Sequence, residues 1–234
     1  MTDLHTHLLP GMDDGSENME ETFTMLRLCA AQGVKTVVAT PHFDLKKETI
    51  AAFAARRSAA IATVTQQAGR EGLPAILPGA EVFFGLELCQ CEDLSSLCLA
   101  GSNAMLLELP MSPWSRQLLD AVYQFICTSG VTVVIAHVER YFGTQSRGNL
   151  KTLFAMGALL QVDADFFLNL RTRNKALRLL GQNRIHFVAS DCHDPQLRAP
   201  NLGDALNVIG GRLGAETVNR LASRTRQLIH LESE

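Results

Sequence analysis

The sequence predicts an α/β fold in which a largely parallel sheet closes into a barrel. Short β-branched or apolar runs alternate with amphipathic stretches about seven times, which is the pattern of successive β-α units. No linker, repeat or low-complexity tract interrupts them, so we expect one domain over residues 1–234. Imidazole and carboxylate side chains follow the predicted strands, and only a closed ring would bring so many strand ends together.

The first half of the chain starts with an apolar segment that leads into His5 and His7. Asn18 can cap a helix, with Glu21 three residues later as its reciprocal partner, and Gly33 can end that helix. Residues 86–103 indicate only short helical turns. The other elements expected here are a buried strand at 35–40, a long Ala-rich helix at about 46–70 and a strand near 75–77.

The second half continues the same alternation. The run at 131–136 is the clearest strand, because it is almost entirely β-branched and apolar. Helices are expected at about 115–128, 148–156, 171–180, 202–210 and 215–230, and the remaining strands at 104–110, 158–162 and 185–189.

The composition excludes several classes of protein. The net charge of −3 and the pI near 6.2 argue against a general nucleic-acid binder, which usually has a basic face. No apolar run approaches the roughly 18–20 residues that a membrane span needs, and no secretory signal is visible, so we expect no membrane insertion. The six cysteines form no Cys-x-x-Cys pair, which is typical of reduced thiols in a cytoplasmic protein.

The polar residues at the strand ends suggest a metal centre. His5 and His7 share one face of a strand, since alternate residues point the same way. Mixed nitrogen and oxygen donors without thiolate suit Mn, Fe or Zn, and so many donors suggest two or three divalent ions joined by carboxylates. The candidates are His5, His7, His42, Glu81, Glu108, His137, Asp191 and His193, with either Asp13 or Asp14.

The charge of such a centre favours a phosphate monoester as substrate. Three divalent ions, four carboxylates and one hydroxide sum to about +1, and Arg140 and Arg198 on neighbouring loops raise this to about +3. The planar guanidinium groups suit phosphate oxygens. The alternative for each arginine is an ordinary surface ion pair.

Several motifs stand in a characteristic order: His5-x-His7, Ala39-Thr40-Pro41-His42, Gly79-Ala80-Glu81, His137-Val138-Glu139-Arg140-Tyr141 and Ser190-Asp191-x-His193. With Asp13-Asp14-Gly15, Leu107-Glu108 and Arg198, the series resembles the PHP (polymerase and histidinol phosphatase) superfamily. Within it, the chain is most similar to the manganese-dependent protein tyrosine phosphatases encoded with capsule and exopolysaccharide genes. The resemblance runs from Asp3 to about residue 210, and the motifs are specific jointly.

The resemblance implies a distorted (β/α)7-type barrel with a three-metal cluster, manganese being the first expectation. It implies a phosphotyrosine-protein phosphatase that uses a metal-bound hydroxide and controls polysaccharide synthesis, with a bacterial tyrosine kinase as its partner. Arg140 and Arg198 would grip the phosphate. By the family pattern, one ion would be held by His5, His7, Glu81 and Asp191, a second by Glu81, Glu108 and His137, and a third by Asp14, His42 and His193.

Some roles are open. Asp13, if it is not a ligand, is a candidate proton donor to the leaving group; Glu139 is another, although orienting Arg140 suits it better. Cys192 and Arg198 have the Cys-x5-Arg spacing of cysteine-dependent phosphatases, but Pro195 removes a backbone donor that such a loop needs. Asp163 and Asp165 are candidates for supporting the site, whereas we expect structural or surface positions for Trp114, His186 and His230.

Two alternative functions come from the same residues. One is a PHP-type phosphoesterase for a small molecule such as histidinol phosphate or a sugar phosphate. The other is a metal-binding regulatory domain without turnover, which would be expected to lack a ligand, and none is missing. The sequence departs from the tyrosine phosphatase branch around residues 43–48 and 86–103. Because these loops shape the pocket mouth, the departure affects substrate preference more than metal chemistry.

Overall fold

The computed structural model describes residues 1–231, except for the side chains of residues 68–71. Its strands form a curled parallel sheet in which every neighbouring pair is parallel. One part has the order β1 (Thr2–Thr6), β2 (Thr36–Ala39), β4 (Ala75–Pro78), and the other has the order β3 (His42–Phe43), β5 (Glu81–Phe83), β6 (Ala104–Glu108), β7 (Thr132–Ile135), β8 (Leu159–Asp163), β9 (Phe187–Ala189).

The two parts are joined by the chain itself. β3 follows β2 after Thr40 and Pro41, and β5 follows β4 after two residues, so each pair continues one path. Pro41 lacks an N–H group and interrupts the ladder, although its carbonyl still accepts from the Glu81 N–H at 3.2 Å. At the other edge, the Asp191 N–H donates to the His5 carbonyl at 2.9 Å, and Thr6 bridges to Cys192. The end of β9 therefore lies beside the end of β1.

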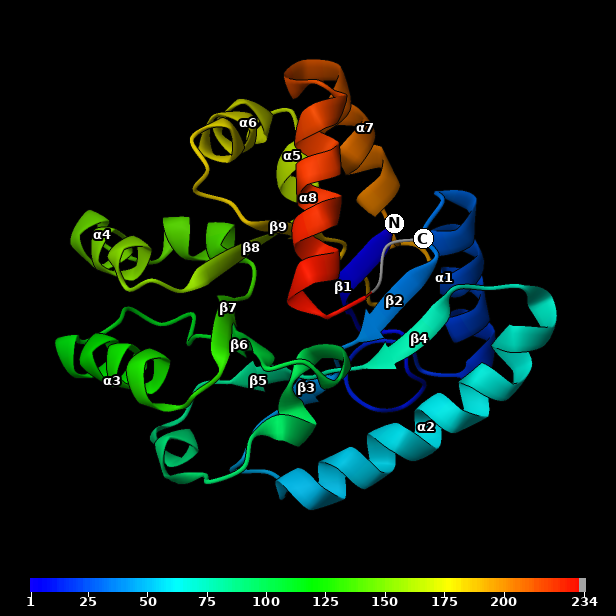
Figure 1. Ribbon diagram of the computed structural model, residues 1–234, viewed down its shortest axis with the longest axis horizontal. Helices are drawn as coiled ribbons and strands as arrows, with labels where there is room; N and C mark the ends of the chain where they lie inside the picture. Colours follow the sequence, from blue (N-terminus) through cyan, green and yellow to red (C-terminus); the bar gives the residue numbers. More distant parts are fainter. Residues whose placement is uncertain (232–234) are drawn as a thin grey trace.

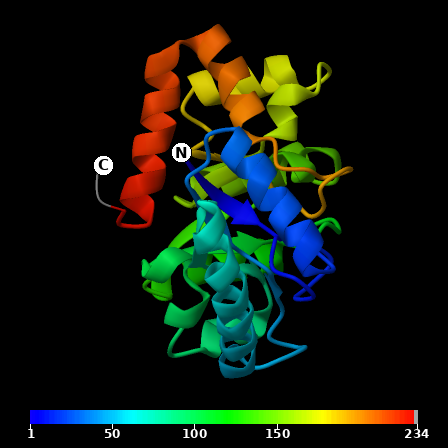
Figure 2. The ribbon, with the colours of Figure 1, turned by 90° about the vertical axis from the view of Figure 1, so that its right-hand side faces the viewer.

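Helices surround these strands (Figures 1 and 2). In Figure 2, α7 and α8 lie at one end of the molecule, α2 lies at the other, and α1 faces the viewer. The helices are α1 (Met19–Ala31), α2 (Ile50–Glu71), α3 (Arg116–Thr128), α4 (Arg147–Ala155), α5 (Asp165–Leu168), α6 (Arg173–Gly181), α7 (Leu202–Leu213) and α8 (Ala215–Leu228). The short 3-10 helices are Leu86–Gln90, Ser95–Leu97, Leu99–Gly101 and Val138–Gly143.

One capping contact and one helix start differ from the sequence-based expectation. The side chain of Asn18 does cap α1 by accepting from the Glu21 N–H at 3.1 Å, but the Glu21 carboxylate reaches the Glu17 N–H at 2.8 Å instead of that of Asn18. Helix α2 begins at Ile50, four residues later than expected, because Thr49 caps it by accepting from the Ala52 N–H at 3.2 Å. The predicted helical turns within 86–103 are confirmed as three 3-10 helices.

A small apolar cluster lies directly beneath the polar strand ends. It contains Leu106 of β6, and Leu159 of β8 packs against it. These residues stand two positions before Glu108 and four before Asp163, and therefore on the same faces of those strands. A register shift between Asp3 and Thr6 also lets β1 contribute Leu4 to this cluster. The α/β class and the curled parallel sheet are thus confirmed, whereas the full (β/α)7 barrel stays a prediction.

Candidate metal centre

The predicted ligands gather at the carboxyl ends of the strands, in three overlapping groups of donor atoms. Within each group the donor atoms lie no more than 4.8 Å from one another. The groups are His5, His7, Glu81 and Asp191; His42, Glu81 and Glu108; and His7, Asp14, His42 and His193. His137 belongs to none of these sets, but its Nε2 atom lies 2.6 Å from Glu81 Oε1 and 3.7 Å from Glu108 Oε1.

The first group has the shape of a tetrahedral metal site. Its atoms are Nε2 of His5 and His7, Oε2 of Glu81 and Oδ1 of Asp191, and five of the six distances between them are 3.1–3.3 Å. The centre of a tetrahedron with such edges lies about 2.0 Å from each corner, which is an ordinary length for a bond from a metal to nitrogen or oxygen.

The outward nitrogens of both imidazoles have partners that settle which nitrogen faces this group. His5 Nδ1–H donates to Gln161 Oε1 at 3.2 Å, and His7 Nδ1–H donates to Asp13 Oδ2 at 2.6 Å. In a neutral ring the Nε2 atom then carries a lone pair. Two such lone pairs 3.1 Å apart, beside two buried carboxylates, repel one another unless positive charge lies between them. The residues therefore fit a cation.

The pKa shifts of the ligands also indicate that positive charge is favourable between them. Burial alone would lower the pKa of His5, but the Asp191 and Glu81 carboxylates outweigh it and raise that pKa to about 9. Burial and the charge of Glu81 raise the pKa of Glu108 above its usual value. Positive charge between these groups, as protons or as metal ions, relieves the repulsion among the carboxylates.

Glu81 is placed between the first and second groups. Its Oε2 atom faces His5 and His7, and lies 3.1 Å from His42 Nδ1. Its Oε1 atom faces His137. One carboxylate with its two oxygens in adjacent donor groups has the geometry that a bridging ligand requires. His42 Nδ1 lies 4.0 Å from Glu108 Oε2 and completes the second group.

The third group is more exposed. Asp14 Oδ1 lies 3.3 Å from His42 Nε2 and 3.6 Å from His193 Nε2. His193 Nδ1–H donates to the Asp191 carbonyl at 3.0 Å, which leaves its Nε2 atom for a ligand. Burial, assisted by the neighbouring His7, lowers the pKa of His193 to about 4, so this ring is neutral and able to coordinate.

Asp13 faces away from the third group. Its carboxylate accepts from His7 Nδ1–H, from the His42 N–H at 2.9 Å and from the Gly15 N–H at 3.0 Å. Gly15 allows this loop to fold against His7, because a Cβ atom there would lie 2.0 Å from the His7 carbonyl oxygen. Burial would raise the pKa of Asp13, but His7 and the backbone donors lower it to about 2. An ionised Asp13 suits the orientation of His7, and its role as a proton donor stays a prediction.

The two predicted phosphate-binding arginines both contact the Asp191 carboxylate. Arg198 donates to Asp191 Oδ2 at 2.6 Å, and Arg140 donates to the same oxygen. Arg140 also donates to Asp163 Oδ2 through its Nε atom at 3.0 Å and its terminal nitrogen at 2.7 Å. Glu139 accepts from the Asp163 N–H at 3.0 Å, so its contact with Arg140 runs through Asp163, and the orientation of Arg140 by Glu139 stays a prediction.

Sequence reasoning missed Gln161, which connects several of these groups. Its Oε1 atom accepts from His5 Nδ1–H and from the His137 N–H at 2.8 Å, while its Nε2 atom donates to Asp163 Oδ1 at 3.1 Å. The only signal was a polar residue in an apolar run. Asp3 was also missed: it is buried and accepts from the Ser190 N–H at 3.0 Å, and burial raises its pKa to about 6.

Two site residues have left-handed backbone conformations. His137 has φ 32° and Asp191 has φ 51°, and each comes just after a strand. Non-glycine residues at positive φ are costly and are found mainly where the surroundings hold them in place. Here the backbone N–H of His137 is held by Gln161, and that of Asp191 by the His5 carbonyl.

The remaining candidates lie outside the donor groups. Cys192 is buried against the core, and burial raises the pKa of its thiol to about 12, which is unsuited to a nucleophilic thiolate. Trp114 is buried, and its indole donates to the Pro110 carbonyl at 2.7 Å. Asp165 accepts from the side chain of Asn201 at 2.8 Å, away from the ligands.

Comparison of the chain with known proteins identifies relatives along nearly its whole length. The chain is 31% identical to tyrosine-protein phosphatase YwqE of Bacillus subtilis, over 98% of the chain and 91% of the relative. It is 27% identical to tyrosine-protein phosphatase CpsB of Streptococcus agalactiae, over 98% of each.

A solved structure agrees in fold. It comes from a study of YwqE from Bacillus subtilis and CpsB from Streptococcus pneumoniae, described as unique metal-dependent tyrosine phosphatases. It superimposes with a TM-score of 0.84 at 28% identity and covers 100% of this chain and 96% of its own. The family model described as "Capsular polysaccharide synthesis, CpsB/CapC" matches residues 1–229. The chain therefore belongs to the CpsB/CapC family.

Proposed function

We propose that this protein is a metal-dependent phosphatase of phosphotyrosine proteins that acts in the control of capsule or exopolysaccharide synthesis. The observation that carries the proposal is the set of three overlapping donor groups with two arginines beside it. The family supports the substrate class, because its curated relatives are named tyrosine-protein phosphatases.

The donor set suits two or three divalent ions, with manganese as the first expectation and iron or zinc as alternatives. When bound, such ions polarise phosphoryl oxygens and lower the pKa of water, so that hydrolysis can run near neutral pH. We propose that His5, His7, Glu81 and Asp191 hold one ion and that Glu81 bridges to a second. His137, Glu108, Asp14, His42 and His193 complete the second and third sites.

Residues around the ligands orient the imidazole and guanidinium groups of the site before a substrate binds. Asp13 and Gln161 hold the rings of His7 and His5 with Nε2 facing the ions. Asp163 fixes Arg140, so its guanidinium is oriented before a phosphate arrives. Arg140 and Arg198, both partly exposed, can then bind the non-bridging oxygens of the phosphate and stabilise their charge during transfer.

The rim of the site favours a protein substrate over a small molecule. Among the described residues, five large apolar side chains are exposed, and four of them lie in the loops and short helical segments that follow strand carboxyl ends. A phosphorylated protein can cover such side chains, whereas a small sugar phosphate or histidinol phosphate cannot. The four are Leu86, Met111, Leu170 and Leu197, and the fifth, Tyr123, lies on α3.

The finer structural and cellular assignments belong to the same proposal. We propose a single PHP-type domain over residues 1–234 with a distorted (β/α)7-type barrel, supported by the contact between the ends of β9 and β1. The proposed partner is a bacterial tyrosine kinase of polysaccharide synthesis, in the cytoplasm. Among the described residues, no helix combines the length and apolar character needed to cross a bilayer.

The proposal is tested by comparing kcat/KM for a phosphotyrosine peptide, a phosphoserine peptide and histidinol phosphate in manganese buffer. We expect the phosphotyrosine peptide to be the best substrate and a chelator to abolish turnover. A preference for histidinol phosphate would favour the small-molecule alternative. Absence of turnover with all three in the metal-loaded protein would favour a regulatory domain.

A further inference from the structure

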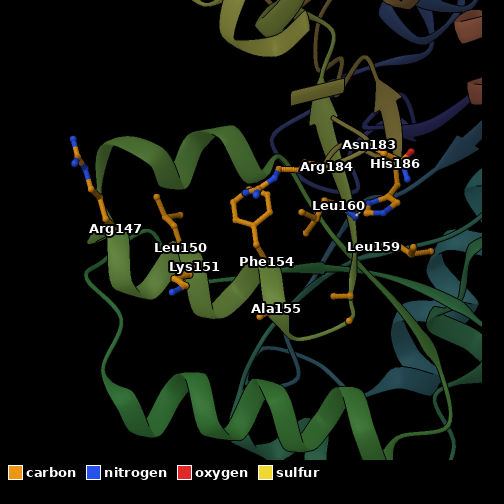
Figure 3. A pocket seen from close by; sticks show the side chains of 12 residues that line it. Arg147, Leu150, Lys151, Phe154, Ala155, Leu159, Leu160, Asn183, Arg184 and His186 are labelled. Carbon is orange, nitrogen blue, oxygen red and sulfur yellow. Dashed lines mark hydrogen bonds between the residues drawn. The ribbon is translucent and has the colours of Figure 1, made fainter. Parts of the chain in front are cut away.

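A second pocket lies at the opposite end of the sheet from the metal centre. It has a volume of about 690 Å³ and lies between α4 and the starts of β8 and β9 (Figure 3). Leu159 of β8 lines it, whereas Asp163 at the other end of the same strand supports Arg140. Four residues of extended chain span roughly 13 Å, so the pocket is separate from the metal centre.

The charges around this pocket are all of one sign. Arg147, Lys151 and Arg184 line it, and no carboxylate does. Arg147 and Lys151 form no ion pair with any described residue, and Arg184 lies over the ring of Phe154 at 5.8 Å. These cations create a local positive potential in a chain whose net charge is −3.

The uncharged polar residues of the pocket also present donors. The Leu160 N–H donates to His186 Nδ1 at 3.0 Å, so the neutral ring carries its proton on Nε2. Burial and the nearby Arg224 keep the pKa of His186 below its usual value, so the ring is neutral. Arg224 donates to Asn183 Oδ1 at 2.7 Å, which leaves the amide N–H groups of Asn183 available.

The pocket is built for an extended ligand with an apolar part. Figure 3 shows Arg147 at one end, Arg184 over Phe154 near the middle and His186 at the other end, so these groups do not converge on one point. A single phosphate is better held by convergent donors. The surface between the cations is apolar and includes Leu150, Phe154, Leu159 and Leu160.

We propose that this pocket binds an acidic segment of a partner protein, with an apolar side chain of that segment resting on the apolar surface between the cations. Arg147 and Lys151 stand one helical turn apart on α4 and meet successive carboxylates. Arg184 and His186 meet the far end of the segment. Binding there leaves the metal centre open, so the protein can hold a partner by one end while it works on a phosphate at the other.

The test uses fluorescence anisotropy with a fluorescein-labelled peptide of six Asp and Glu residues around a central Phe. We expect binding in the micromolar range at low salt, weakening as salt rises. The double variant Lys151→Glu/Arg184→Glu is expected to bind at least about tenfold more weakly. The control Arg27→Glu/Arg212→Glu changes the charge equally on exposed positions of α1 and α7 and is expected to bind within about twofold of the unmodified protein.

Further measurements distinguish binding in this pocket from binding at the metal centre and from attraction to any polyanion. Replacing the central Phe of the peptide with Ser is expected to weaken binding several-fold, and a chelator is expected to leave binding unchanged. Both protein variants are expected to hydrolyse p-nitrophenyl phosphate at the unmodified rate, which also shows that they fold. Equal binding by both variants, loss of binding on chelation, or tighter binding of a single-stranded oligonucleotide would overturn the proposal.

Discussion

Replacing Gln161 by Met tests whether hydrogen bonds from residues around the ligands orient those ligands for metal binding. Methionine has a similar volume, so packing is largely retained, but the acceptor for His5 Nδ1–H and the His137 N–H is lost. Removing a partner of this kind typically costs about 10–100-fold in metal affinity or activity. This corresponds to about 1.4–2.7 kcal/mol.

The assay is a manganese titration of the metal-free protein by calorimetry, with p-nitrophenyl phosphate turnover recorded over the same concentrations. We expect Gln161→Met to need about 10–100-fold more manganese and to recover part of its activity when manganese is raised. Gln145→Met is the matched control, because Gln145 is also buried and accepts from the Trp114 N–H at 2.8 Å, but it lies outside the donor groups.

The control variant is expected to lose stability, by about 1–3 kcal/mol for its unpaired donor, and to keep its manganese affinity. An unchanged metal titration in Gln161→Met would refute the reasoning. So would an equal loss of metal affinity in Gln145→Met, because the effect would then reflect general destabilisation.

Three further predictions concern pH, the thiol and the rim. Because the folded-state pKa of His5 is raised to about 9, its contribution to the stability of the metal-free protein should be complete below about pH 6.5 and should be lost as the pH rises towards 9. Thermal unfolding in a chelator checks this, and a rise in stability over that range would contradict it. Cys192→Ala should keep turnover in manganese buffer, whereas loss of turnover in a folded variant would revive the thiol mechanism. Leu197→Ser, at a side chain that is 92% exposed, should lower kcat/KM for a phosphotyrosine protein and not for p-nitrophenyl phosphate. The same change at Tyr123 on α3 should affect neither substrate, and equal effects at both positions would exclude a rim contact.

The sequence was informative where one strand or helix carries its own signal. β-branched runs predicted the strands, and a histidine or acid just after each run predicted the ligands. The parallel alternation implied that these strand ends share one edge, and the nine predicted ligands do gather there. Local capping was also readable, as Asn18 shows.

The features that the sequence did not predict depend on contacts between distant segments. Gln161 is one polar residue in an apolar strand, and only the approach of His5, 156 positions away, gives it a partner. Likewise, nothing local distinguishes Asp13 from Asp14. The structure distinguishes the two, because the Asp13 carboxylate accepts a hydrogen bond from His7, whereas the Asp14 carboxylate lies beside His42 and His193. The left-handed backbone of His137 is similarly imposed by its surroundings.

The most direct test of the central claim is the metal content of the purified protein and of its Glu81→Gln variant, measured by mass spectrometry after manganese loading. Glu81 contributes one oxygen to each of two adjacent groups, so its loss should empty more than one site. We expect two or three ions per chain in the unmodified protein and at most one in the variant. An unmodified protein that binds no stoichiometric metal, or a variant that retains the full complement, would contradict the account.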